Sequence, residues 1–201
     1  MGLDDELAAH VAALAGTVAG SSGIIADIVA RLSSCFDQGG KLLICGNGGS
    51  AADAQHLAAE FINRMRVDRR PWPAIALTTD TSVLTSIAND AAYDDVFARQ
   101  VEALGRPGDV LIGMSTSGRS ENVLAALSAG RRRGMVTVGF TGEAGAKRMG
   151  ADCDHLLVVP SHDTARIQEC HEFVYHVIAG MVEEQLFGSG SAEPERVRTQ
   201  E

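Results

Sequence analysis

The sequence predicts an α/β fold, a doubly wound parallel five-stranded sheet with flanking N- and C-terminal helices. Short apolar runs alternate with segments whose apolar residues recur at helical spacing. This alternation implies right-handed crossovers that cover both faces of a parallel sheet with helices. The predicted strands are residues 41–45, 74–77, 110–114, 136–140 and 155–159. The predicted helices are residues 50–65, 82–89, 93–104, 120–133 and 164–186.

The two ends of the chain differ in pattern. Apolar residues at helical spacing over residues 3–36 predict two helices, or one helix kinked near Gly20 to Gly23, that could cover the sheet or a partner subunit. Residues 188–201 lack apolar periodicity and are expected to form a disordered tail. Residues 1–187 are therefore expected to form a single domain.

Composition excludes several classes of function. The chain has 201 residues, of which 45% are hydrophobic and only 4% aromatic, so one domain with an aliphatic core is expected. A net charge of −9 without a basic stripe argues against a nucleic-acid surface. No signal peptide is recognisable, and no uncharged apolar run reaches the ~18 residues of a membrane span, so a cytoplasmic protein is expected. The four cysteines lack C-x-x-C spacing and are expected to be reduced, packed thiols.

A glycine-rich turn follows the first predicted strand and leads into a helix. Gly46, Gly48 and Gly49 allow a tight turn and close approach of a ligand, and the helix beginning near Ser50 directs free N–H groups at that ligand. A phosphate fits such a turn. His56 and Glu60 are four residues apart, on one face of the same helix. The helix therefore combines a phosphate site with a titratable pair.

The same turn also matches the pattern G-x-G-x-x-A of dinucleotide-binding folds. Such a fold places an acidic residue at the end of the next strand, about 20 residues further on. Asp68 has this spacing but precedes the next predicted strand, and Asp80, which follows that strand, is 34 residues from Gly46. A dinucleotide site is therefore the less favoured alternative.

A second strand-to-helix loop carries four hydroxyl groups. They belong to Ser115, Thr116, Ser117 and Ser120, the last of which is the expected N-cap of the following helix. Ordinary capping would explain this loop alone. Because ligands of doubly wound sheets bind at the carboxyl ends of the strands, two such loops on one edge favour a sugar-phosphate pocket.

Further candidates lie on the C-terminal helix. Gln168 and His176 are eight residues apart, hence about 80° apart around the axis and roughly 12 Å apart along it. A lone histidine in a helix is more often structural than a ligand. His10, His155 and His162 are interpreted as structural residues for this reason, and the role of His171 stays open.

Four segments carry a family resemblance. GNGGSAADAQHLAAE, LTTDTSVLTSIAND, STSGRSENV and PSHDTARIQECHEFVYHVI, in this order, resemble the sugar isomerase (SIS) domain family, and within it the phosphoheptose isomerases. The resemblance extends over about residues 5–187. It implies conversion of D-sedoheptulose 7-phosphate to D-glycero-D-manno-heptose 7-phosphate, the first step of nucleotide-activated heptose biosynthesis, by a homotetramer with zinc at an intersubunit site, one ion per subunit.

The resemblance also implies the roles of individual residues. Zinc would be held by His56, Glu60, Gln168 and His176. The substrate would be held by Asn47, Gly48, Gly49, Ser50, Glu60, Asn89, Asp90, Ser115, Thr116, Ser117, Ser120 and Gln168.

The residue types suit an aldose-ketose isomerase that works through an enediolate. Glu60 is the expected base and His176 the expected acid, with zinc polarising the oxygens. Because Gln168 and His176 are so far apart along one helix, we expect one of the two to reach the ion from a neighbouring subunit.

Two alternatives belong to other functional classes. The first is a noncatalytic scaffold of the same fold that binds a replication initiator protein, and retention of Glu60 and His176 favours the enzyme over it. The second is a sugar-phosphate-sensing regulatory module, which is disfavoured because no fused DNA-binding segment is recognisable in the sequence.

Overall fold

The computed structural model describes residues 2–188 and confirms the predicted α/β class. Five strands, all parallel, form one sheet in the order β2-β1-β3-β4-β5. The strands are β1 (Leu42–Gly46), β2 (Ala74–Ala76), β3 (Val110–Met114), β4 (Val136–Gly142) and β5 (His155–Val159). The α-helices are α1 (Leu3–Asp37), α2 (Gly49–Ile62), α3 (Thr81–Asp90), α4 (Ala98–Leu104), α5 (Glu121–Arg132), α6 (Ala146–Met149) and α7 (Thr164–Phe187).

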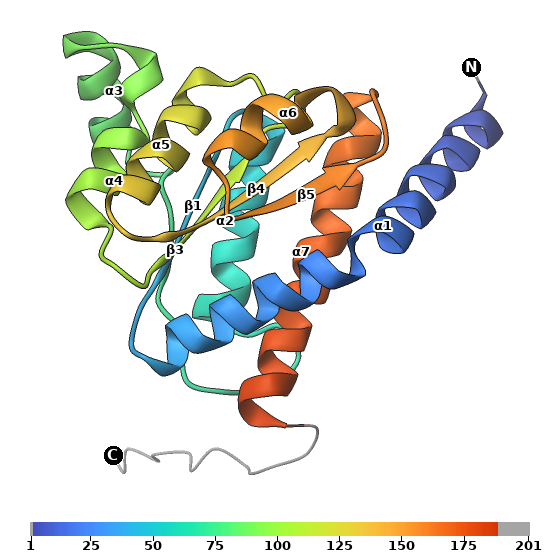
Figure 1. Cartoon of the computed structure of the whole chain (residues 1–201), viewed down its shortest axis with the longest axis horizontal. Coiled ribbons are helices and arrows are strands. Elements are labelled where there is room, and N and C mark those ends of the chain that lie inside the picture. Colours follow the sequence, from blue (N-terminus) through green and yellow to red (C-terminus); the bar gives the residue numbers. More distant parts are fainter. Residues whose placement is uncertain (1, 189–201) are drawn as a thin grey trace, which may run out of the picture.

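Two hydrophobic cores cover the two faces of the sheet. On one face, α1, α2 and α7 pack on alternate strand residues such as Leu42, Ile44 and Ile112. On the other face, α4 and α5 pack on the intervening residues Leu43 and Leu111. Figure 1 shows α3, α4 and α5 grouped at one side of the molecule and α1 and α7 at the other. This is the arrangement expected when both faces of a parallel sheet are buried.

The N-terminal segment forms one helix rather than two. Its helical structure is continuous from Leu3 to Asp37, and Figure 1 shows that α1 bends part-way along. Its later residues, including Ile28 and Leu32, are buried in the core, whereas Leu3 and Leu7 near its start are exposed. Among the described helices, α1 has the length and apolar composition that a membrane span would need, and one such helix near an N-terminus is weak evidence for a membrane.

The structure differs from the predicted elements at three places. The helix expected over residues 93–104 is a short 3₁₀ turn, Tyr93–Asp95, followed by α4, because the adjacent residues Val96 and Phe97 are both buried between the two. The four-residue α6 is too short for apolar periodicity to indicate it. Strand β4 continues to Gly142 because its last residues still pair with β5. Of the predicted tail, residues 189–201 lie outside the described residues.

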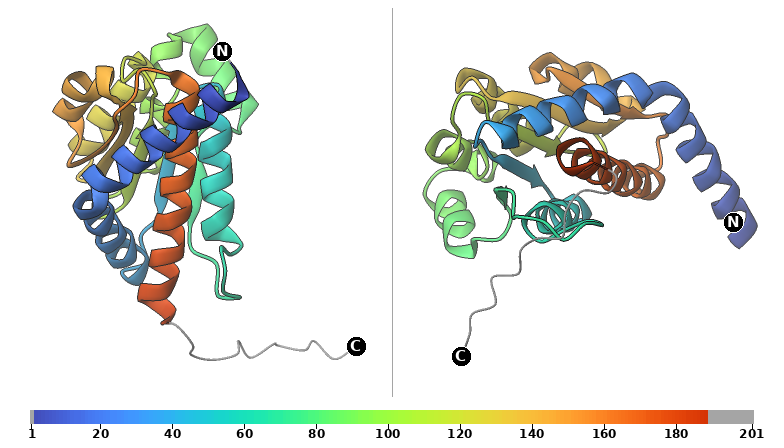
Figure 2. Two further views of the ribbon diagram at one scale, coloured as in Figure 1. Left: turned by 90° about the vertical axis from the view of Figure 1, so that its right-hand side faces the viewer. Right: turned by 90° about the horizontal axis from the view of Figure 1, so that it is seen from below.

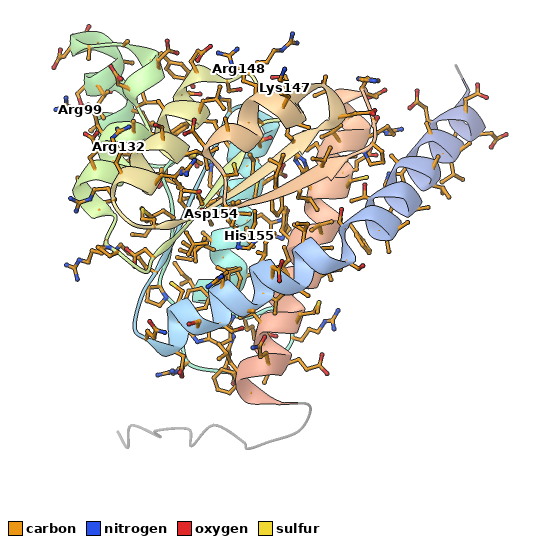
Figure 3. The ribbon with its side chains drawn as sticks, viewed as in Figure 1. Arg99, Arg132, Lys147, Arg148, Asp154 and His155 are labelled. Atoms are coloured by element: carbon orange, nitrogen blue, oxygen red, sulfur yellow. The ribbon has the colours of Figure 1, made fainter. Side chains whose placement is uncertain are left out.

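Two arginines on the α4–α6 side form ion pairs with nearby carboxylates. Arg132 and Arg148, both labelled in Figure 3, form ion pairs with Glu102 and Glu121 respectively. Asp154, on the loop before β5, accepts hydrogen bonds from the backbone N–H and the hydroxyl of Thr137. These basic residues are therefore matched by nearby carboxylates.

Candidate active site

The candidate site lies where the strand order reverses. Strands β1 and β3 are neighbours, with Gly46 in register with Met114. The chain leaves β1 toward α2 on one face and leaves β3 toward α5 on the other. Such a switch point opens a crevice at the carboxyl ends of the strands, where doubly wound folds bind their ligands. Both predicted phosphate loops meet at this point.

The glycine-rich turn is shaped by conformation and by packing. Gly48 has a φ of 55°, a left-handed conformation that a side chain disfavours. A Cβ on Gly49 would collide with the amide of Gln168 on α7. The start of α2 therefore lies directly against α7.

An amide pair joins the glycine-rich turn to α5. Asn47 and Asn122 exchange two hydrogen bonds, of 2.8 and 2.9 Å, and the Tyr93 hydroxyl donates to Asn47 Oδ1 at 3.0 Å. The Asn122 side chain is buried. Asn47, a predicted substrate residue, therefore also holds the two phosphate loops in register.

The hydroxyl loop does not cap its helix with a side chain. Ser120 is the N-cap residue of α5, but its Oγ lies 2.9 Å from Ser115 Oγ instead of accepting from the helix N–H groups. Gly48 at the start of α2 likewise provides no side-chain cap. By contrast, Asp80 and Asp163 cap α3 and α7 through their carboxylates. No side chain therefore caps the first N–H groups of the two helices at the switch point, and an anion can bind to such uncapped groups.

Three of the four predicted metal ligands come together in one chain. The ligand atoms of His56, Glu60 and His176 all lie within 4.8 Å of one another. His56 Nε2 is 3.2 Å from Glu60 Oε1 and 3.4 Å from His176 Nε2. The first two residues come from α2 and the third from α7, and Figure 2 shows these helices side by side. These three side chains are called the triad below.

The parallel run of α2 and α7 bears on the prediction that either Gln168 or His176 reaches the ion from a neighbouring subunit. Gly49 and Asp53 face Gln168, His56 faces Tyr175 and His176, and Met65 faces Glu183, so the two helices run in the same direction. His176 therefore meets His56 and Glu60 of its own chain. Gln168 Nε2 donates to Asp53 Oδ1 at 3.3 Å, about one helical turn before His56, so its role as a fourth ligand stays a prediction.

Sequence reasoning missed two residues on α2 and α7 that lie beside the triad. Asp53 is buried, and burial raises the pKa of its carboxyl, although Gln168 opposes the shift. It lies three residues before His56 on the same helix face, which is the signal that could have identified it. Tyr175 is fully buried and its hydroxyl lies 2.9 Å from His56 Nδ1. Burial, with the nearby carboxylates, raises the pKa of Tyr175, so its phenol is protonated at neutral pH.

Two predicted substrate residues lie on α3, not on the helices that carry the triad. Asn89 and Asp90 are exposed at the end of α3, where the Asn89 amide donates to the Asp90 carboxylate at 2.8 Å. The other predicted substrate residues lie in the two loops at the switch point or on α2 and α7. If Asn89 and Asp90 act in catalysis, they meet the substrate from a separate element.

Three of the other histidines contact groups outside the triad. His10 lies 2.7 Å from Glu169, and His162 lies 3.6 Å from Glu143. His171 is fully buried against Phe140, with 5.5 Å between ring centroids. Burial lowers the pKa of His171 to about 4, so it is neutral at physiological pH.

Comparison with known proteins identifies the family. The model of the SIS domain family matches residues 7–142. The chain belongs to the SIS domain family. It is 56% identical over 186 residues to a phosphoheptose isomerase of Roseiflexus sp. (strain RS-1), a match that covers 91% of this SIS domain protein and 92% of that relative.

Solved structures agree with this assignment. A phosphoheptose isomerase from Neisseria gonorrhoeae matches with a TM-score of 0.82 and 43% identity, covering 91% of this SIS domain chain and 100% of that one. One from Francisella tularensis matches with a TM-score of 0.85 and 34% identity, covering 90% and 96%. The family resemblance predicted from the four sequence segments is thereby confirmed.

Proposed function

We propose that this SIS domain protein is a phosphoheptose isomerase that converts D-sedoheptulose 7-phosphate to D-glycero-D-manno-heptose 7-phosphate, the first step of nucleotide-activated heptose biosynthesis. The observation that carries the proposal is the arrangement along α2, which begins at a phosphate-type turn and presents His56 and Glu60 further along the same helix. The phosphoheptose isomerases that match nearly the whole chain support the same assignment.

The spacing along α2 suits a seven-carbon substrate. His56 follows Gly49 by seven residues, which is about 10 Å of helix at ~1.5 Å per residue. A C–C bond of about 1.5 Å advances an extended chain by about 1.25 Å, so six such bonds and a phosphate ester span on the order of 10 Å. A phosphate on C7, held at the start of α2, therefore allows C1 and C2 to reach the triad.

The two uncapped helix starts would hold the phosphate. Backbone N–H groups of α2 and α5, with the hydroxyls of Ser50, Thr116, Ser117 and Ser120, supply donors without a cationic side chain. Gly48 and Gly49 leave the backbone accessible, because both residues are exposed. This mode of binding suits a protein of net charge −9, since it creates no extended positive surface.

Proton transfer is assigned to Glu60 and His176. Glu60 takes the proton from C1, the C–H electron pair becomes the second bond of the C1=C2 enediolate, and the proton returns to C2. Meanwhile His176 carries the proton that leaves O1 and is needed at O2, so that the carbonyl moves from C2 to C1. The Glu60 side chain is 17% exposed, so it is accessible but partly shielded from water.

The donor set fits a zinc ion, one per subunit. Two atoms each about 2.0–2.1 Å from a tetrahedral ion stand about 3.3 Å apart. The separations of 3.2 Å from His56 Nε2 to Glu60 Oε1 and 3.4 Å to His176 Nε2 are close to this value. His56, Glu60 and His176 would hold the ion, with Gln168 as the fourth ligand, and bound zinc would supply electrostatic stabilisation for enediolate charge. A carboxylate bound tightly to zinc cannot act as a free base at the same time, so Glu60 would need one oxygen free of the ion to accept the proton from C1.

We assign the protein to the cytoplasm as a homotetramer with intersubunit active sites. Large apolar side chains are exposed on the terminal helices: Leu3, Leu7, Val11 and Val18 on α1, and Phe173 and Met181 on α7. Apolar residues that repeat along a helix and face solvent support an assembly through these helices. Small sugar phosphates are the expected partners, and neither nucleic acid nor a membrane is.

The enzyme is favoured over the replication-initiator scaffold. The relatives that match most of the chain are named phosphoheptose isomerases. The triad also places acid, base and candidate metal ligands together, an arrangement that a scaffold does not require.

The direct test is incubation of the purified protein, with defined metal content, with sedoheptulose 7-phosphate, followed by NMR of the sugar. The expected result is the aldose heptose 7-phosphate, with exchange of one carbon-bound proton when the reaction runs in deuterium oxide. Unchanged substrate at every metal content would overturn the proposal.

A further inference from the structure

Tyr175 is held at the far nitrogen of His56. Its hydroxyl oxygen lies 2.9 Å from His56 Nδ1, while His56 Nε2 faces Glu60 and His176. The imidazole therefore presents one nitrogen to the candidate metal ligands and the other to the phenol. The two rings meet edge to face, with centroids 5.5 Å apart and an interplanar angle of 77°.

The phenol is fixed in place, whereas the imidazole is not. Tyr175 is fully buried in the core that packs α1, α2 and α7 on the sheet. The His56 side chain is 43% exposed and belongs to a surface that faces the site. The Glu172 carboxylate is the other nearby group, but at 3.8 Å from Nδ1 it is beyond hydrogen-bond distance. Of these two groups, only Tyr175 lies within hydrogen-bond distance of His56 Nδ1.

We propose that Tyr175 is a positioning residue that fixes the ring orientation and tautomer of His56 for metal binding. This inference rests on the metal site of the proposed function. A neutral histidine that coordinates through Nε2 carries its proton on Nδ1, and that N–H needs an acceptor. The Tyr175 oxygen provides the acceptor at 2.9 Å, so the ring is oriented for the ion before the ion binds.

The effect of such an outer contact is measurable in metal affinity. Loss of a residue that orients a metal-bound histidine typically weakens metal binding 10–100-fold. Tyr175→Phe removes only the hydroxyl and keeps the buried ring. Tyr93→Phe is a matched control, because Tyr93 is the other of the chain's two tyrosines and its hydroxyl donates to Asn47 instead of contacting His56.

The experiment is a competition between the protein and a chromophoric zinc chelator, for the wild type, Tyr175→Phe and Tyr93→Phe. We expect the zinc dissociation constant of Tyr175→Phe to rise by about 10–100-fold, with Tyr93→Phe within about twofold of the wild type. Thermal unfolding of the metal-free proteins checks that the fold is kept. Equal affinity of Tyr175→Phe and wild type would overturn the inference while leaving the metal site intact, and failure of the wild type to bind zinc would instead overturn the metal site.

A second measurement needs no variant. In zinc-loaded wild-type protein labelled with ¹⁵N-histidine, NMR identifies which nitrogen of His56 carries a proton. The inference requires a protonated Nδ1 and a metal-bound Nε2. Metal binding through Nδ1 would contradict it, even if Tyr175→Phe proved too unstable to study.

Discussion

Ser120 shows how one hydroxyl can distinguish capping from ligand binding. The residue occupies the N-cap position of α5, yet its Oγ lies beside Ser115 Oγ and not on the helix N–H groups. A serine that only capped the helix would use that oxygen for the second or third N–H of the helix. The Ser120 side chain therefore leaves the first N–H groups of α5 uncapped, while the Val123 and Leu124 N–H groups donate to the Ser120 carbonyl oxygen.

The phosphate contacts should act on substrate binding more than on turnover. Thr116→Ala combined with Ser120→Ala is expected to raise KM more than it lowers kcat, because a phosphate is bound alike in the ground state and the transition state. Steady-state kinetics with sedoheptulose 7-phosphate provide the measurement. A pure loss of kcat with unchanged KM would contradict phosphate binding by this loop.

Glu60 and His176 should show the opposite behaviour. Glu60→Gln keeps the size of the side chain and removes the base, so kcat is expected to fall by ~10² or more, and His176→Gln should behave similarly. Substrate binding, measured by calorimetry, should persist in both variants. Either variant keeping most of its turnover at saturating substrate would show that the role assigned to that residue is wrong.

His171 should make the protein sensitive to acid. Its folded-state pKa of about 4 lies below the usual value of 6.5. Between pH 6.5 and pH 4, His171 is therefore protonated in the unfolded chain but stays neutral in the native state. The contribution of neutral His171 to the free energy of unfolding is therefore fully present above pH 6.5 and is lost as the pH falls toward 4. At about 1.4 kcal/mol per pKa unit, this residue removes about 2 kcal/mol between pH 7 and pH 5.

The measurement for His171 is urea unfolding at fixed protein concentration at both pH values. His171→Gln removes the titrating group, so the drop in unfolding free energy between pH 7 and pH 5 should shrink by about 2 kcal/mol relative to the wild type. An identical drop in the two proteins would show that another group controls the acid response.

Asp53 and Tyr175 mark the limit of what could be predicted at the residue scale. The motif residues His56 and Glu60 could be placed because the four-residue spacing and the helix lie in one segment. The contacts of Asp53 with Gln168 and of Tyr175 with His56 join positions more than 110 apart in the chain. Apolar periodicity states that α2 and α7 have buried faces, but it does not state which turns of the two helices meet.

At the scale of elements, a buried ion pair fixes α7 to the end of α2. Glu183 on α7 accepts hydrogen bonds from the backbone N–H groups of residues 65–67 and from Arg69 Nε at 2.9 Å. Arg69 in turn donates to the carbonyl oxygens of Glu60 and Phe61 in the last turn of α2. Burial alone would raise the pKa of Glu183, but these donors outweigh it and lower that pKa. Arg69, held by Glu183 of α7, therefore caps the carboxyl end of α2, the helix that carries Glu60.

Breaking this pair should destabilise the fold strongly. Glu183→Gln leaves the Arg69 guanidinium buried without its counter-charge, so we expect a loss of about 3–5 kcal/mol in the free energy of unfolding. Glu102→Gln is the control, since its pair with Arg132 is more than half exposed on both sides and should cost less than about 1 kcal/mol. Urea unfolding measures the free energy of unfolding of both variants. Equal losses would show that the buried pair stabilises the fold no more than the exposed pair does.

At the scale of the whole molecule, the sheet order could be predicted only in part. Alternation of apolar runs and helical patterns was sufficient for five parallel strands with helices on both faces, and the structure confirms this class. The order β2-β1-β3-β4-β5 is set by long-range pairing, and the short edge strand β2 has too few residues to indicate its place by pattern. The two phosphate loops meet because β1 and β3 are neighbours in the sheet, and the sequence of neither loop predicts that pairing.

The triad within one chain predicts the outcome of mixing two inactive variants. If Gln168 and His176 acted on one ion from different subunits, mixing Glu60→Gln with His176→Gln could restore sites that hold both wild-type residues. In the structure Glu60 and His176 belong to the triad of one chain. Every site in such a mixture lacks one of them, so we expect no recovery of activity even after verified subunit exchange.

Asp90 provides the informative counterpart. It is exposed at the end of α3, and its hydrogen bond is to the adjacent Asn89 rather than to the triad. We predict that Asp90 acts in the site of a neighbouring subunit. Mixing Glu60→Gln with Asp90→Ala should then restore activity, up to about a quarter of the wild-type value, because one random pairing in four joins an intact triad to an intact Asp90. Subunit exchange is verified by mass spectrometry of differently labelled chains. Recovery in the first mixture would contradict the triad within one chain, and failure in the second would place Asp90 within the site of its own chain or outside every site.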